Sequence, residues 1–414
     1  LYHKTIKYKI EDINLTKMRT NSIKSIISLI IMIFTQAACN SPVNISGKLT
    51  GSVKKDIKVY LIKPETLWEV GSSYNGKIIG SAVVNSDGSF AFHNLPKTKE
   101  PVLLELAIQM SSKAPNYLQT DEIDKSNYMP ILWQSSNPIQ ITAQADEFQK
   151  SFTIENPSGI NRALLDLRDI NQKAYQTYLK GKHWEIEDGR ELMEKENAIL
   201  QYQKELIEFA DSTPYIMPAM LALRWVSPEN YYERVPEFLV RQCAKWKEKQ
   251  PEHPWIKQLC KRSKPSNLPV LVGDVFPNIH LPTIEKDTFF LKNHLGDKIT
   301  IIDIWASWCA PCRIENREVL VPLWKEYHNK GLKIIAYGLE SDLFSWKAAA
   351  EKDGANQWLQ ASDLQGDDAS FLKEIRIQTI PANFILDDKG VVLAKNIHGS
   401  DLMELVKNYM KIKE

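Results

Sequence analysis

The residues best suited to chemistry are Cys309 and Cys312, which are separated by two residues in the run Trp-Ala-Ser-Trp-Cys-Ala-Pro-Cys over 305–312. A hydrophobic stretch precedes this run and apolar residues at helical spacing follow it, so a strand should lead into a helix here. A Cys-x-x-Cys motif delivered onto the first turn of a helix is typical of a dithiol redox site. The unpaired N–H groups and partial positive charge of a helix N-terminus favour a thiolate. We therefore expect Cys309 to be an exposed, acidified nucleophile and Cys312 to be a buried resolving thiol.

A zinc half-site is the alternative for the same cysteine pair. Zinc sites of this kind need a second pair of Cys or His ligands at short spacing. The nearest candidates, His280, His294 and His328, each stand alone in the sequence. The spacing therefore favours redox chemistry and predicts no metal.

Three segments around the cysteines resemble the thioredoxin superfamily and, within it, the membrane-anchored TlpA/ResA-like thiol–disulfide oxidoreductases. Ile-Asp-Ile-Trp over 302–305 is similar to the family's strand whose aspartate lies buried behind the resolving cysteine. Thr-Ile-Pro over 379–381 is similar to the family's cis-proline loop, which faces the dithiol and holds an extended substrate segment. Glu315 matches an acidic residue that ResA-like proteins carry near the active site. The resemblance covers the chain from Val272 to the C-terminus and implies a thioredoxin fold there.

The resemblance implies the catalytic roles. Cys309 attacks a substrate disulfide and Cys312 resolves the mixed disulfide, while Asp303 or Glu315 relays the proton through water. The residues themselves leave plainer roles open. Asp303 could form a local hydrogen bond, although an unpaired carboxylate in an apolar run is costly and tends to have a raised pKa. Glu315 could simply complement the helix dipole.

Substrate docking is implied for Ile380 and Pro381, and shielding of the site for Trp308. The resemblance also implies that Pro381 is cis, whereas an ordinary trans turn proline is the plain alternative. One departure is visible, because thioredoxins usually place a kinking proline where this chain has Arg317. Pro322 could move the kink further along the helix.

The whole chain is long enough for more than one domain. It has 414 residues, and Lys plus Arg (52) nearly balance Asp plus Glu (51), which gives a net charge of +1 and no indication of a nucleic-acid partner. Short, evenly spaced strands over 43–150 predict a β-sandwich, with an Asp-Gly hairpin signal at 87–88. The strand pattern at its start is also similar to a β-sandwich domain of unknown function that precedes thioredoxin domains in anchored bacterial lipoproteins. Periodicity over 157–263 predicts helices, and 270–414 should hold the thioredoxin-like α/β domain.

The N-terminus resembles a bacterial lipoprotein signal. Basic residues after Met18 precede a short apolar stretch over 26–34, and Ala-Ala stands before Cys39. We expect residues 1–39 to be a non-mature leader and signal peptide, with Cys39 lipidated at the mature terminus. Gln36 departs from the usual lipobox, and an uncleaved membrane-anchored signal is the alternative.

Two cysteines remain after these assignments, Cys243 and Cys260. They flank a Pro-rich turn at 251–254 at similar distances, so antiparallel helices would bring them together. An exported protein can keep such a pair as a disulfide, and two buried free thiols are the alternative.

These observations predict a lipid-anchored thiol–disulfide oxidoreductase of the cell envelope or periplasm. By resemblance, it reduces disulfides of envelope proteins, apocytochrome c among the candidates, and takes electrons from a membrane dithiol protein without a dissociable cofactor. The residues before Cys309 lack the Pro-x-x-x-Thr/Ser-x-x-Cys setting of peroxiredoxins. The alternative from another class is an envelope binding or scaffold protein whose dithiol is vestigial.

Overall fold

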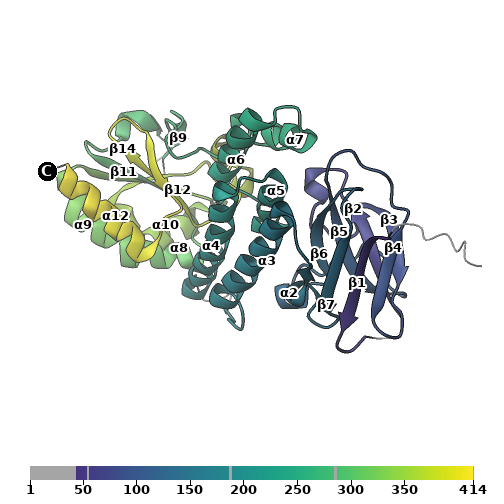
Figure 1. Ribbon diagram of the computed structural model, residues 1–414. Coiled ribbons are helices and arrows are strands. Elements are labelled where there is room, and N and C mark those ends of the chain that lie inside the picture. Colours follow the sequence, from purple (N-terminus) through teal and green to yellow (C-terminus); the bar gives the residue numbers. More distant parts are fainter. Residues whose placement is uncertain (1–42, 54–55, 186–188, 284–286, 414) are drawn as a thin grey trace, which may run out of the picture.

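The computed structural model describes residues 43–53, 56–185, 189–283 and 287–413. The predicted leader, including Cys39, lies outside these residues. Figure 1 shows a β-rich region at one end of the molecule, a helical region in the middle and an α/β domain at the other end. In the described ranges, none of the helices combines the length and the apolarity that a membrane crossing requires.

Two four-stranded sheets form the β-rich region. The strands are β1 (Val43–Thr50), β2 (Ile57–Lys63), β3 (Lys77–Val83), β4 (Ser89–His93), β5 (Val102–Met110), β6 (Tyr128–Trp133), β7 (Ile139–Gln144) and β8 (Thr153–Ile154). The sheet orders are β4-β1-β7-β8 and β3-β2-β5-β6. Successive side chains of a strand point to opposite faces, so β7 alternates between buried and exposed residues, whereas β5 and β6 are buried on both faces. Ile45 and Phe92 of one sheet and Leu61 and Leu106 of the other belong to a single core cluster.

The Asp-Gly turn at 87–88 connects the two sheets. The sequence predicted a hairpin here, but β3 and β4 belong to different sheets and do not pair. Asp87 Oδ1 accepts a hydrogen bond from the Ser89 N–H at 3.0 Å. Gly88 has a φ of +83°, and a Cβ at this position would lie 2.0 Å from the Leu49 carbonyl oxygen. Turn chemistry is therefore as expected, but strand spacing does not decide which sheet a strand joins.

The helical region packs directly on the sheets. Its main helices are α3 (Gly159–Tyr178), α4 (Gly189–Ser212), α5 (Ile216–Val226), α6 (Pro236–Lys249) and α7 (Pro254–Arg262), with short α2 (Phe148–Ser151) before them. The Asn161 side chain of α3 bonds the N–H and the carbonyl of Leu132 in β6 at 2.8 and 2.9 Å. Buried apolar residues of the helices and of both sheets form the same cluster. Residues 43–268 therefore pack as one unit.

The C-terminal domain has a core of its own. Its elements are β9 (His280–Pro282), β10 (Thr288–Phe290), β11 (Ile299–Trp305), α8 (Ala310–Glu315), α9 (Val321–Tyr327), β12 (Leu332–Gly338), α10 (Leu343–Asp353), β13 (Leu359–Ala361), α11 (Ser370–Ile375), β14 (Ala382–Asp387), β15 (Val392–Lys395) and α12 (Gly399–Ile412). The sheet order is β13-β12-β11-β14-β15. The central strand β11 is buried along its whole length and pairs parallel to β12 and antiparallel to β14. A buried strand reads as a continuous apolar run, which explains the stretch before the cysteines.

Candidate active site

The two cysteines lie where strand β11 gives way to helix α8. Cys309 is the N-cap residue of α8, and its sulfur accepts a hydrogen bond from the Cys312 N–H at 3.3 Å. Pro311 occupies the first turn, where its missing N–H leaves no intrahelical bond unmade. Cys309 and Cys312 are joined by a disulfide with a Cα–Cα distance of 5.3 Å. The site therefore combines a two-electron couple with helix N–H groups directed at the first sulfur.

The exposure of Cys309 differs from the expectation. Cys309 is 5% exposed and Cys312 is 2% exposed, whereas the sequence predicted an exposed Cys309. In the disulfide, the Cys309 sulfur is bonded inward to buried Cys312, which removes it from solvent. Trp308, expected to shield the site, is 65% exposed.

Three residues that the sequence did not single out hold the cysteine loop. Buried Glu340, just after β12, accepts hydrogen bonds from the N–H and the hydroxyl of Ser307. Arg313 donates to the Ser307 carbonyl at 3.0 Å and pairs with Asp353, whose side chain is 0% exposed. Burial raises the pKa of Glu340, and the bonds from Ser307 oppose that rise. The general signal for Glu340 was available, because polar groups at the carboxyl ends of parallel strands tend to line sites.

Asp353 also explains the residue that departs from the family pattern. Arg317 donates to Asp353 Oδ1 at 2.7 Å, so both arginines of this helix converge on one buried carboxylate. The helix is interrupted by a π-helical turn, Asn316–Leu320, in which the Val321 N–H bonds the Asn316 carbonyl. Pro322 follows in the first turn of α9, and it cannot donate a hydrogen bond to the preceding turn. The interruption thus includes Arg317, where the family usually has its proline, and ends before Pro322.

Asp303 and Glu315 lie buried in the same domain, and their charges interact. Burial, and secondly the Glu315 carboxylate, raise the pKa of Asp303 well above its ordinary value. Glu315 accepts the Gly399 N–H at the start of α12, at 3.3 and 3.2 Å from its two oxygens, and its Oε1 lies 3.6 Å from His398 Nδ1. A buried carboxyl with a raised pKa can take or release a proton during thiol chemistry.

The proline loop and the dithiol lie at the same end of the sheet, where strand β11 ends and strand β14 begins. Ile304 of β11 pairs with Ala382, the first residue of β14, so Pro381 stands beside the strand end from which the cysteine loop departs. The Ile380–Pro381 peptide bond is cis. In the described part of the chain, the Ile380 N–H and carbonyl have no hydrogen-bond partner. They are therefore available to a bound main chain.

The histidines considered as zinc ligands are engaged elsewhere. His280 stacks on Phe290 with ring centroids 4.6 Å apart, and His328 stacks on Trp324 at 5.1 Å. His294 packs edge-on against Phe289 at 4.8 Å. Among the described residues, no group of three or more His, Cys, Asp or Glu side chains is arranged to hold a metal ion.

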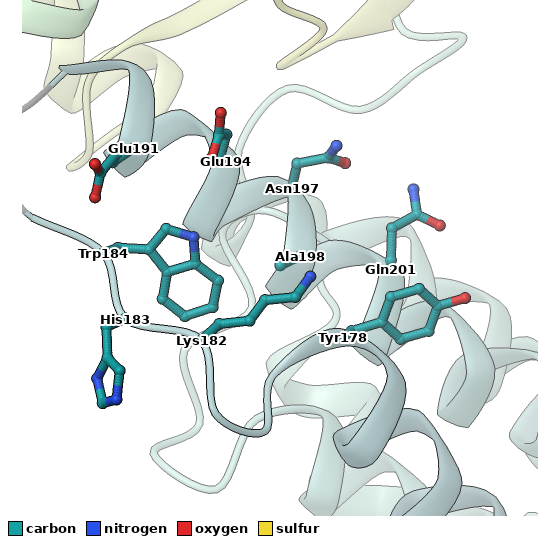
Figure 2. A pocket seen from close by; sticks show the side chains of 9 residues that line it. All are labelled: Tyr178, Lys182, His183, Trp184, Glu191, Glu194, Asn197, Ala198 and Gln201. Atoms are coloured by element: carbon teal, nitrogen blue, oxygen red, sulfur yellow. The ribbon is translucent and has the colours of Figure 1, made fainter.

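Two other features lie in the helical region. Cys243 and Cys260 form a disulfide between α6 and α7, with a Cα–Cα distance of 5.1 Å. A hollow of about 550 Å³ lies beside the start of α4, and Figure 2 shows Trp184 among its lining side chains, with His183 directed away from them. Its lining contains neither a cysteine nor a serine. The dithiol chemistry therefore belongs to the C-terminal domain.

Comparisons with known proteins match this domain. Residues 271–409 match the Redoxin family. The chain is 28% identical over 140 residues to the thiol:disulfide interchange protein DsbE of Pseudomonas fluorescens biotype C, covering 32% of this chain and 71% of that protein. It is 27% identical over 141 residues to the thiol-disulfide oxidoreductase ResA of Bacillus cereus (strain ATCC 10987 / NRS 248), covering 34% of this chain and 77% of that protein. A solved thioredoxin domain of a thiol-disulfide oxidoreductase from Bacteroides vulgatus is 27% identical and covers 34% of this chain and 99% of its own, with a TM-score of 0.31. The sequence matches identify the C-terminal part as a thioredoxin-like redoxin domain, homologous to thiol–disulfide oxidoreductases.

Proposed function

We propose that this thiol–disulfide oxidoreductase is exported, is anchored through a lipid on Cys39 and reduces disulfides of proteins in the cell envelope. The observation that carries the redox assignment is the Cys309–Cys312 couple at the start of α8. Similarity to DsbE and ResA and the lipobox-like segment before Cys39 support the envelope location. Maturation of c-type cytochromes is one process that such a reductase serves. The scaffold alternative is less favoured, because the dithiol and its supporting contacts are intact.

The reaction begins from the reduced enzyme. The Cys309 thiolate attacks one sulfur of a substrate disulfide, which forms a mixed disulfide and releases the other substrate sulfur as a thiolate. Cys312 then loses its proton and attacks the Cys309 sulfur. This step forms the Cys309–Cys312 disulfide and releases the second substrate thiol. Asp303 or Glu315 accepts the Cys312 proton through water.

Two electrons have then passed from the enzyme to the substrate. A second dithiol protein of the membrane restores the enzyme by the same exchange in reverse. Trp308, Ile380 and Pro381 dock the substrate, because they border the dithiol on the cysteine and proline loops. No dissociable cofactor takes part in these steps.

The test is a comparison of two cysteine variants in the full chain. Cys309→Ser removes the sulfur at the helix N-terminus, so we expect it to capture no partners. Cys312→Ser keeps the nucleophile and loses the resolving thiol, so mixed disulfides should accumulate and their partners can be identified by mass spectrometry. If Cys309→Ser is the variant that traps partners, the roles are reversed. If neither variant traps partners and the wild type reduces no disulfide, the proposed function is wrong.

A further inference from the structure

A loop of the helical region contacts the proline loop beside the dithiol. This helical-region loop, residues 231–234, is part of the connection between α5 and α6. Glu233 Oε2 accepts the Gln378 N–H at 3.0 Å, and its Oε1 accepts the Thr379 N–H at 3.1 Å. The Tyr231 hydroxyl donates to Glu233 Oε2 at 2.8 Å and lies 2.7 Å from Thr379 Oγ1. Two residues of the helical region, Tyr231 and Glu233, thus hold the residues just before the cis peptide bond through hydrogen bonds.

A third contact fixes the other side of that bond. Arg234 Nη2 donates to the Pro381 carbonyl at 3.1 Å and forms an ion pair with Glu196 of α4 at 3.2 Å. The main-chain groups of residues 378, 379 and 381 are therefore used by the helical region. Ile380, which lies between them, keeps its N–H and carbonyl free among the described residues.

The helical region also reaches the dithiol helix itself. Gly189, at the start of α4, lies so close to α8 that a Cβ there would be 2.5 Å from Pro311 N and 2.8 Å from the Ala310 carbonyl carbon. Helices α4 and α8 are adjacent in Figure 1. The helical region therefore borders the redox site on the side of the cysteine loop and on the side of the proline loop.

Tyr231 presents its ring at this border. The residue is 46% exposed, although its hydroxyl is bonded to Glu233 and Thr379. What it offers a ligand is thus the apolar ring. Trp308, on the cysteine loop, is a second exposed aromatic side chain beside the dithiol. Exposed aromatic side chains next to free main-chain groups are typical of a surface that binds polypeptide.

We propose that Tyr231 and Glu233 form part of the substrate site, so that substrate recognition requires the helical region as well as the redoxin domain. Glu233 is a positioning residue, because it holds the amides of Gln378 and Thr379 and keeps Ile380 presented. Tyr231 determines specificity: it contacts an extended polypeptide segment that carries an apolar or aromatic side chain next to its disulfide. This inference rests on the proposed disulfide-reducing function.

The inference separates protein substrates from small disulfides. In this proposal, a polypeptide paired with Ile380 runs past Tyr231, whose hydroxyl lies 2.7 Å from Oγ1 of the adjacent Thr379. Bis(2-hydroxyethyl) disulfide has no chain to dock and reaches Cys309 without that contact. A loss of the Tyr231 ring should therefore weaken the reaction with polypeptides alone.

The experiment measures steady-state reduction of insulin and of bis(2-hydroxyethyl) disulfide by the full chain. We expect Tyr231→Ala to raise the KM for insulin about tenfold and to change kcat less than about twofold. The rate with the small disulfide should stay at the wild-type value. Tyr231→Phe keeps the ring and loses the hydroxyl bonds to Glu233 and Thr379, so it should raise the insulin KM less than Tyr231→Ala does. Glu233→Gln should also raise the insulin KM. Phe290→Ala is the matched control, because Phe290 is 47% exposed on the same molecule and outside the site.

Disulfide-bearing peptides test the chemistry of the segment. The wild type should prefer a peptide with Phe beside its cysteine to one with Ser, and Tyr231→Ala should lose that preference. Unchanged insulin kinetics in Tyr231→Ala, with an active wild type, would overturn this inference alone. An equal loss with insulin and the small disulfide would also overturn it, since the ring would then act on the dithiol. A wild type inactive towards both substrates would overturn the proposed function itself.

Discussion

At the scale of the residue, the nucleophilic role proposed for Cys309 rests on its place at the start of α8. The Cys312 N–H already points at the Cys309 sulfur in the disulfide, so the helix dipole and this donor are in position to stabilise a thiolate after reduction. Cys312 is one turn further along, and both cysteines belong to the buried core cluster of this domain. The asymmetry between the two sulfurs follows from their positions on one helix.

Asp303 gives a prediction about both stability and rate. Burial and Glu315 raise the pKa of this carboxyl in the folded protein, so the folded state keeps a proton that the unfolded chain releases. The resulting stabilisation is fully present below the ordinary pKa of aspartate and is lost as the pH rises through the raised value. Asp303→Asn removes this dependence. We expect its free energy of unfolding to fall less than that of the wild type as the pH rises from the ordinary pKa of aspartate through the raised value.

The same substitution should slow resolution of the mixed disulfide, on the order of 10²-fold, because an amide can neither take up nor release the proton that Cys312 exchanges in the proposed mechanism. Denaturant unfolding of the oxidised protein and single-turnover reduction of insulin measure the two effects. Asp388→Asn, in the exposed turn before β15, is the control and should change neither. If Asp303→Asn still loses stability as the pH rises, as the wild type does, and resolves the mixed disulfide at the wild-type rate, the role assigned to Asp303 is wrong.

The sequence predicts site residues that are close to the Cys-x-x-Cys motif in the chain better than site residues that are distant from it in the chain. Spacing was sufficient for the dithiol and for its place on a helix. Glu340 and Asp353 reach the cysteine loop from later strands and helices, and Glu233 lies 145 residues before Gln378. No local pattern reports such contacts, because they depend on how the domains pack.

At the scale of the element, helix propensity could not decide where the helix that carries the dithiol is interrupted. The sequence indicated a kink and left its position open between Arg317 and Pro322. The π-helical turn, Asn316–Leu320, contains Arg317 and ends before Pro322, and an ion pair from the partly exposed Arg317 to the buried Asp353 anchors it. Its place therefore depends on tertiary contacts as well as on proline.

The α6–α7 hairpin carries a stability prediction. Its disulfide closes a 17-residue interval between Cys243 and Cys260, which stabilises by about 3 kcal/mol in the chain-entropy model. We expect the Cys243→Ala/Cys260→Ala double variant to lose about that much free energy of unfolding in urea, without loss of disulfide reductase activity. Wild type treated to block only free thiols is the control. An unchanged unfolding midpoint would show that the pair is not bonded in solution.

At the scale of the whole molecule, two cores meet across a polar boundary. The sheets and helices of residues 43–268 share one apolar cluster, and the redoxin domain has another. Ion pairs such as Lys395 with Glu237 at 2.8 Å cross between them. The order of the β-rich, helical and α/β parts was predictable from composition and periodicity. The shared core of the first two parts was not, because periodicity shows which face of an element is apolar and does not show which element packs against that face.

Anchoring belongs to the same scale. The two alanines before Cys39 and the short apolar stretch predict that Cys39 is the lipidated first residue of the mature protein. Mass spectrometry of the membrane fraction should find a diacylated Cys39 peptide, and Cys39→Ser should release the protein from that fraction. A mature terminus elsewhere, or a retained Met18, would contradict the anchor.

The direction of electron flow is the central claim, and the reduction potential of the Cys309–Cys312 couple tests it most directly. The full chain is equilibrated with glutathione buffers of known potential, free thiols are alkylated, and mass spectrometry of the peptide that carries both cysteines gives the reduced fraction. Because the readout is peptide-specific, the Cys243–Cys260 bond does not interfere. We predict a potential near about −270 mV, which is typical of a protein that donates electrons to disulfides. A value near about −120 mV, typical of an oxidant, would contradict the account.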